Sequence, residues 1–305
     1  MKSINFTVLG DQSIANDFGK KGTSSDLTLF DRKDSDIIRT WVAPNGFPDK
    51  IQPLLQSLYL SEYVIFHVSS LDKFTGEQIV ALDCLGKRDG ILSHSYDVDE
   101  STLNAMIKGT VLENYKKVEK DNLKEEMMKL PVIEKDGSPC IVIDHCFDVK
   151  GVGTVVLGKV ISGKIIQYDK ITHHPSNTEA MVKSIQMHDD DVKEVQSPAR
   201  VGFSLKNLKP DDVTRGDVLS DDGSVKVVEE IELDFKPSPF YKNEISENEM
   251  CLVSIGMQVK AGKFVSISPM KLKLDKPIVV LPGDICVLLK PESKSIRIIG
   301  SGKTD

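Results

Sequence analysis

Residues 147–171, FDVKGVGTVVLGKVISGKIIQYDKI, constrain the fold of this 305-residue chain more than any other stretch. Short runs of β-branched residues alternate with glycines, first at Gly151 and Gly153 and later at Gly158 and Gly163. Runs of this composition, bounded by glycine or serine, predict short strands that are joined by tight turns. Glycine suits such turns and bulges because it adopts backbone conformations that strain other residues. The stretch therefore predicts part of a small β-barrel.

The order of these residues resembles the opening of the second domain of the translational GTPases, the family of elongation factor Tu, SelB and the gamma subunit of initiation factor 2. That opening follows the pattern F-x-[IV]-x-G-x-G-T-V-x-x-G-x-[IV]-x-x-G-x-[IV]-x-x-[GD]-D. The residues that match it are Phe147, Val149, Gly151, Gly153, Thr154, Val155, Gly158, Val160, Gly163, Ile165 and Asp169. Residues 211–219, DDVTRGDVL, resemble the close of the same domain. The resemblance implies a β-barrel over residues 134–222.

A second β-rich region follows. Short apolar runs between residues 227 and 299 predict further strands. Residues 281–284, LPGD, and residues 297–302, RIIGSG, resemble the third domain of the family and its ending. The resemblance implies a second barrel of the elongation-factor type over residues 223–305.

The first third of the chain has a different pattern. Residues 4–9, 63–68 and 90–92 are short apolar runs that predict strands, and apolar residues recur at helical spacing in 49–60 and 75–85. Strands that alternate with helices predict parallel βαβ packing. Residues 103–128 predict one or two further helices. The whole chain is therefore expected to be a multidomain α/β plus β protein: a reduced P-loop-GTPase-like α/β domain over 1–133, followed by the two barrels.

The expected phosphate site lacks the chemistry of a P-loop. A P-loop reads G-x-x-x-x-G-K-[ST], because backbone amides cradle the phosphates, the lysine neutralises them and the hydroxyl holds Mg²⁺. Counted from Gly10 at the end of the first strand, the last three positions are Ala15, Asn16 and Asp17. No lysine is present, and an acidic residue replaces the hydroxyl.

Two further GTPase motifs are also degraded. Residues 42–46, VAPNG, stand where the family has D-x-P-G-H, and residues 94–97, HSYD, keep only Asp97 of the guanine motif N-K-x-D. Each lost charge-assisted contact removes about 1.5–3 kcal/mol of binding energy. We therefore expect weak or absent binding of GTP and Mg²⁺, no GTP hydrolysis and no catalytic residue. Gly10, Ala15, Asn16, Asp17 and Asp97 are then a vestigial nucleotide site.

A lysine-containing segment follows this vestigial site. It consists of Gly19, Lys20, Lys21, Gly22, Thr23 and Ser24. Its composition predicts a loop that either binds an anion or an RNA phosphate or is simply a solvated surface loop. Both interpretations remain open.

Residues 199–205, ARVGFSL, resemble a strand of the second domain of the family. In elongation factors this domain, together with the GTPase domain, forms the pocket for the aminoacyl end of tRNA. The resemblance implies a pocket for a tRNA end near Arg200, Phe203 and Asn207. The alternative is that these residues only form the core and a turn of the barrel.

Composition limits the classes of partner. The net charge is −7, from 39 basic and 46 acidic residues, so sequence-independent binding to DNA is not expected. The five cysteines form no C-x-x-C pair and no metal site is expected; they indicate reduced thiols and a cytoplasmic protein. No apolar run reaches membrane-spanning length.

These observations predict a SelB-like binding protein that has lost GTP hydrolysis and that binds tRNA, the ribosome or a translation factor. One alternative is a translational GTPase that binds nucleotide through non-standard phosphate contacts at Lys20 and Lys21. Another alternative is a protein-interaction scaffold without RNA. The sequence does not identify the oligomeric state.

Overall fold

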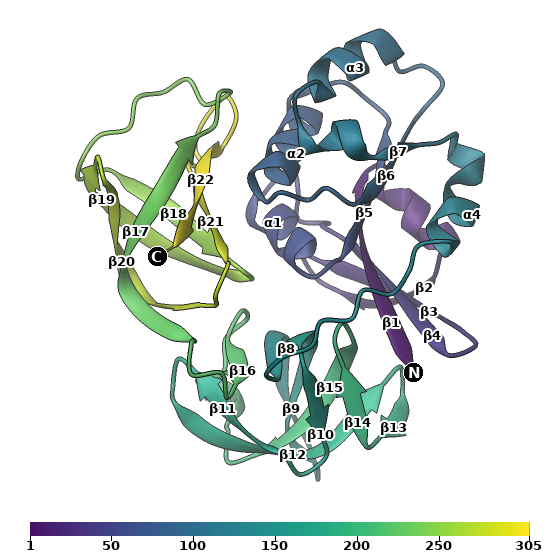
Figure 1. Cartoon of the computed structure of the whole chain (residues 1–305), viewed down its shortest axis with the longest axis vertical. Coiled ribbons are helices and arrows are strands. Elements are labelled where there is room, and N and C mark those ends of the chain that lie inside the picture. The colour runs from purple at the N-terminus through teal and green to yellow at the C-terminus, as the bar shows by residue number, and fades with distance from the viewer. Residues whose placement is uncertain (305) are drawn as a thin grey trace.

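A computed structural model of the chain describes residues 1–304. The chain forms three units that are arranged as a triangle: a mixed α/β domain, a barrel that follows it in sequence, and a second barrel at the C-terminus (Figure 1). No helix within residues 1–304 is both long and apolar enough to cross a membrane.

The first domain is built on a seven-stranded sheet in the order β2-β3-β4-β1-β5-β6-β7. Its strands are β1 (Lys2–Gly10), β2 (Lys20–Ser24), β3 (Thr28–Asp34), β4 (Ile37–Ala43), β5 (Tyr63–Val68), β6 (Gly90–His94) and β7 (Lys116–Lys117). In this order, the neighbouring strands β4, β1, β5, β6 and β7 are parallel to one another. Strands β2, β3 and β4 pair antiparallel at the other end of the sheet. The expected parallel βαβ packing is confirmed, and three strands between residues 20 and 43 are additional.

Short helices connect the strands of this sheet. They are α1 (Gln52–Tyr59), α2 (Lys73–Cys84), α3 (Glu100–Ile107) and α4 (Leu123–Met128), with 3-10 turns η1 (Gln12–Asp17), η2 (Val111–Asn114) and η3 (Lys120–Asn122). The apolar spacing in 49–60 and 75–85 correctly predicted α1 and α2. Asp72 begins α2 because its side chain accepts hydrogen bonds from the first free backbone amides, those of Phe74 and Thr75.

The second unit is a closed barrel. Its strands are β8 (Cys140–Val149), β9 (Gly153–Ser162), β10 (Lys164–Ile166), β11 (Lys170–His174), β12 (Thr178–Met187), β13 (Asp190–Val192), β14 (Glu194–Gln196), β15 (Arg200–Lys206) and β16 (Val218–Ser220), with the turn η4 (Pro210–Asp212). The order β11-β16-β8-β9-β15-β12 is closed by the pairing of β11 with β12. Gly158 is required where β9 crosses β8, because a Cβ atom there would lie 2.3 Å from the carbonyl oxygen of Val142.

The third unit is a closed barrel with the order β17-β20-β19-β18-β21-β22. Its strands are β17 (Lys226–Pro237), β18 (Met250–Ile255), β19 (Gln258–Ile267), β20 (Met270–Val280), β21 (Ile285–Leu289) and β22 (Ile298–Thr304). The expected architecture of a P-loop-like α/β domain followed by two barrels is therefore confirmed.

The three units share apolar cores. One cluster joins Leu27 and Leu60 of the first domain to Val142 of the second unit and Met257 of the third. Buried apolar contacts of this kind favour one fixed arrangement of the units.

Candidate anion-binding cleft between the first domain and the second unit

The carboxyl end of β1 differs structurally from a phosphate-binding loop. Gly10 has φ +74°, and a Cβ atom there would lie 1.9 Å from the carbonyl oxygen of His67. The Gly10 amide donates a hydrogen bond of 2.8 Å to the Gln78 Oε1. A P-loop leads into an α-helix whose amides face the phosphate, whereas β1 leads into the 3-10 turn η1 and then into strand β2.

The predicted vestigial residues are dispersed around this end of the sheet. Ala15 is fully buried, Asn16 donates its side-chain amide to the Ser13 carbonyl at 2.8 Å, and Asp17 is exposed. Asp97 is exposed on the loop after β6. None of these residues, nor Gly10, lines the cleft described below.

His67 occupies the space beside Gly10. Its ring lies 2.7 Å from Ser93 Oγ through Nδ1 and 3.3 Å from Ser95 Oγ through Nε2, and the residue is fully buried. Burial lowers the pKa of the His67 imidazole, and the nearby Lys120 cation lowers it further. These contacts make His67 a hydrogen-bonded core residue.

The lysine segment is not a loop, and the sequence prediction was wrong on this point. Residues 20–24 form the edge strand β2, in which Lys20 pairs with Asp31 and Lys21 with Phe30 of β3. The segment has low strand propensity, but pairing with β3 outweighs it, because strand formation depends strongly on the neighbouring strand. Thr23 lies in this strand, and its side chain is outside the described part of the structure.

A cleft of about 410 Å³ separates β2 from the second unit. Its walls are residues 20–22, Asp31, Ile38 and Thr40 on one side and Leu157, Gln186, His188, Asp189 and residues 200–202 on the other. The cleft therefore brings Lys20 and Lys21 opposite Arg200, although these residues are far apart in the sequence. Within residues 1–304, neither lysine forms an ion pair.

Of the three residues predicted for a tRNA-end pocket, only Arg200 lines this cleft. Phe203 is fully buried in the barrel core, and Asn207 lies at a turn with φ +67°. Because side chains alternate along a strand, Arg200 points outward from β15 and Phe203 points inward. Phe203 therefore belongs to the barrel core, as the alternative interpretation held, whereas the exposed Asn207 lies outside this cleft.

Arg200 is held by a buried carboxylate. Its Nη2 lies 2.9 Å and 3.2 Å from the two carboxylate oxygens of Asp144, and its Nε is buried and has no hydrogen-bond partner within residues 1–304. Burial by itself would raise the pKa of the Asp144 carboxyl, but Arg200 and His145 lower that pKa below its ordinary value. Asp144 is therefore ionised, and it orients Arg200 at the cleft wall.

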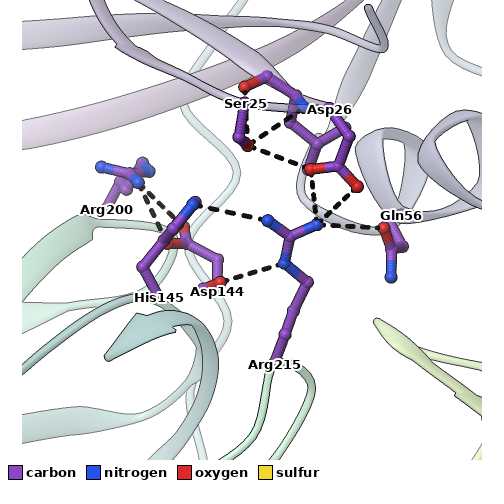
Figure 2. Close-up of polar contacts among 8 residues, drawn as sticks. Ser25, Asp26, Gln56, Asp144, His145, Arg200 and Arg215 are labelled. Atoms are coloured by element: carbon purple, nitrogen blue, oxygen red, sulfur yellow. Dashed lines mark hydrogen bonds and ion pairs between the residues drawn. The ribbon is translucent and has the colours of Figure 1, made fainter. Parts of the chain in front are cut away.

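Sequence reasoning missed Arg215, which links the two walls of the cleft. Figure 2 shows its side chain extending from the second unit toward Asp26 in the turn between β2 and β3. The same guanidinium contacts Gln56 of α1 and the β8 residues Asp144 and His145. Arg215 lies in the segment TRGD, which resembles the close of the second domain of the family. That resemblance indicated where the domain ends but did not indicate a role for the arginine.

A buried ion pair forms the base of the same interface. Lys159 on β9 contacts the Glu62 carboxylate, and both side chains are less than 10% exposed, at 6% and 7%. Glu62 also accepts hydrogen bonds from the Asn5 amide and side chain at 3.0 Å and 2.9 Å. Asn5 in turn donates to the Pro198 carbonyl at 2.8 Å.

Comparison with known proteins identifies relatives of two kinds. The domain described as elongation factor Tu domain 2 matches residues 153–220. The uncharacterized protein MJ0325 of Methanocaldococcus jannaschii is 36% identical over 298 residues, which cover 96% of each chain. The selenocysteine-specific elongation factor of the same organism is 32% identical over 149 residues, or 47% of this chain and 32% of that protein.

A solved structure extends the likeness to the entire fold. The elongation factor SelB of Methanococcus maripaludis, in complex with a GTP analogue, superimposes with a TM-score of 0.84 at 18% identity, covering 100% of this chain and 79% of that one. At this identity the superposition establishes the fold alone.

Proposed function

The chain belongs to the translational GTPase-like family, and from this premise we propose that it is a binding protein of the translation apparatus that works without a GTP switch. Its ligand is the anionic end of a tRNA, which lies in the cleft between β2 and the second unit. The observation that carries this proposal is the convergence of Lys20, Lys21 and Arg200 from two domains on one cleft. Phosphate contacts by lysine and arginine supply most of the affinity of proteins for nucleic acids.

The end of β1 supports the absence of a switch. A GTPase switch depends on contacts of the γ-phosphate and Mg²⁺ with mobile loops. Here the Gly10 amide is already bonded to Gln78, and no lysine follows in η1. Several missing contacts at about 1.5–3 kcal/mol each would lower the affinity for GTP by at least about three decades.

The binding test is fluorescence anisotropy with labelled tRNA at several salt concentrations. We expect Lys20→Ala/Lys21→Ala to weaken binding at least about tenfold. The slope of the logarithm of the binding constant against the logarithm of the salt concentration should become shallower by about 1.4, since each phosphate contact of a single strand contributes about 0.7. The matched control is Lys116→Ala/Lys117→Ala, on the opposite edge strand of the same sheet. Those lysines already contact Glu126 and Asn104, so the control should bind normally.

Either result of this test is informative. If the wild-type protein does not bind tRNA even at low salt, the RNA-binding proposal is wrong and a protein-interaction scaffold becomes the better account. Equal loss of binding in both lysine variants would show that the cleft is not the site.

The switch is tested separately by equilibrium binding of fluorescent GTP and GDP, with and without Mg²⁺. We expect no saturable binding at high micromolar protein. Tight binding that requires Mg²⁺ would overturn this part of the proposal and would favour a working nucleotide site with unusual contacts. A Lys20→Ala/Lys21→Ala variant would then show whether those lysines hold the phosphates.

A further inference from the structure

We propose that Arg215 is a positioning residue that sets the separation between the two walls of the cleft, and so between Lys20 and Lys21 on one wall and Arg200 on the other. This inference rests on the proposed function, because it concerns how the same cleft is kept ready for an anionic ligand. Arg215 is not among the residues that line the cleft. It acts through two segments that adjoin cleft residues: the β2–β3 turn, which follows the lysine strand, and the middle of β8, where Asp144 binds Arg200.

On the first-domain side, Arg215 holds the turn that carries the lysine strand. Its Nη1 donates to both carboxylate oxygens of Asp26 at 2.8 Å. Asp26 lies between β2 and β3, two residues after the end of the strand that carries Lys20 and Lys21. Because β2 is an edge strand that pairs only with β3 in this sheet, a fixed Asp26 restrains the position of both lysines.

On the barrel side, Arg215 reaches the residues that hold Arg200. Its Nε donates to the Asp144 carbonyl at 3.1 Å, and its Nη2 lies 3.4 Å from His145 Nε2. Asp144 in turn binds Arg200, and its carboxylate lies 2.7 Å from His145 Nδ1. When the His145 proton is on Nδ1, this N–H donates a hydrogen bond to the Asp144 carboxylate, and the unprotonated Nε2 can accept a hydrogen bond from Arg215. A continuous set of contacts therefore runs from Asp26 to Arg200 (Figure 2).

The base of the Arg215 side chain is itself restrained. Gly216 follows it with φ +94°, and a Cβ atom there would lie 2.6–2.9 Å from atoms of Gln258 and Met257 in the third unit. The Gly216 amide donates to the Ile143 carbonyl at 2.8 Å. The turn thus has little freedom to move, and Arg215 extends from a fixed point to both walls.

Arginine is specifically suited to this role. Its planar guanidinium directs three nitrogens toward different acceptors, whereas the lysine ammonium is a single charged point. Here Nη1 contacts Asp26, Nε contacts Asp144 and Nη2 contacts His145. Lysine at position 215 would keep the charge but could not satisfy all three groups.

The experiment compares tRNA affinity in Arg215→Lys and Arg215→Gln, with Arg32→Lys as the control for an exposed, ion-paired arginine of the first domain. A positioning role predicts that both Arg215 variants lose affinity by about tenfold, since a charge-assisted contact is worth about that factor. Arg215→Lys with wild-type affinity would overturn the proposal, because charge alone would then suffice. Circular dichroism and the melting temperature establish that each variant is folded.

A second variant keeps the test decisive if Arg215 is needed for folding. Asp26→Asn removes the charge of a partly exposed partner and conserves its shape. If Asp26 and Arg215 act through one contact, the double variant Asp26→Asn/Arg215→Gln binds tRNA no more weakly than the Arg215→Gln single variant. Losses that multiply would contradict the proposal. Failure of the wild-type protein to bind tRNA contradicts the proposed function instead, so the two failures are distinguishable.

Discussion

The first domain makes two interfaces that differ in kind. Toward the third unit, the residues Val287, Leu289 and Ile298 join the same apolar core as helices α1 and α2. A buried ion pair crosses the same interface: Glu77 of α2 is fully buried, and its carboxylate lies 2.6 Å from Arg297 Nη2 of the third unit. Toward the second unit, an apolar contact of Leu27 and Leu60 with Val142 is accompanied by buried and exposed ion pairs, and a cleft lined by Lys20 and Lys21 lies beside them.

The difference indicates which interface is structural and which is functional. An interface with a continuous apolar core behaves like the interior of a domain, whereas polar interfaces between domains resemble those of transient complexes. The third unit is therefore integrated into the fold of the first. Unpaired cations at the other interface have no structural purpose that the described contacts reveal, and they fit the recognition of an anionic ligand.

The largest effect is expected at the interface with the third unit. Glu77→Ala would leave the Arg297 guanidinium buried without its carboxylate, and removal of one partner of a buried pair costs about 3–5 kcal/mol. We expect a loss of this size in the free energy of unfolding, measured by urea denaturation. The matched control is Glu125→Ala, in which the side chain is 70% exposed and stability should be unchanged.

An intermediate effect is expected at Asp284, whose carboxylate accepts a hydrogen bond of 2.9 Å from the Leu281 amide and lies near Tyr59 of α1. Burial raises the pKa of this carboxyl to about 6. The native state therefore holds a proton that the unfolded state releases between about pH 4 and 6, and stability from this group falls as the pH rises through that range. Asp284→Asn should stabilise the protein by about 1–2 kcal/mol at pH 8 and should give no gain below pH 4.

The measurement is the difference in free energy of unfolding between Asp284→Asn and wild type across the pH range. Comparison with wild type at each pH removes the contributions of the other titrating groups. A difference that does not depend on pH would show that burial does not raise the pKa of the Asp284 carboxyl. The interface between the first domain and the third unit would then be more hydrated at Asp284 than its packing indicates.

Local sequence patterns predicted much of the fold. The strands at 4–9 and 63–68 and the helices at 49–60 and 75–85 have strong apolar periodicity, and all four are present. The strands β2 and β3 escaped prediction because charged residues outnumber their apolar ones, and their strand conformation depends on pairing with neighbours. In β4, IIRTWVA, Arg39 and Thr40 divide the apolar residues into two short runs. Strand β2 is the clearest case, since its sequence KKGTS has turn-like composition.

The candidate site was less predictable because it depends on distant contacts. Arg200 and the two lysines were each singled out from sequence, but only the packing of β2 against the second unit brings them to one cleft. For Phe203 the sequence left a pocket and the barrel core as alternatives, because a family resemblance does not specify which face of a strand a residue occupies, and the structure buries it in the core. Arg215 was missed because its importance comes from contacts with Asp26 and Asp144, both far away in the sequence.

The smallest effect is expected at the rim of the cleft. Lys33 on β3 pairs with Asp190 across the interface at 2.5 Å, and these side chains are 37% and 52% exposed. Exposed pairs contribute little, because water screens the charges and ordering two long side chains costs entropy. Lys33→Ala should therefore change the melting temperature by no more than about 1 °C and tRNA affinity by no more than about twofold. A larger loss of stability in differential scanning calorimetry would mean that rim pairs hold the second unit in place, and the contrast between the two interfaces would then be one of degree.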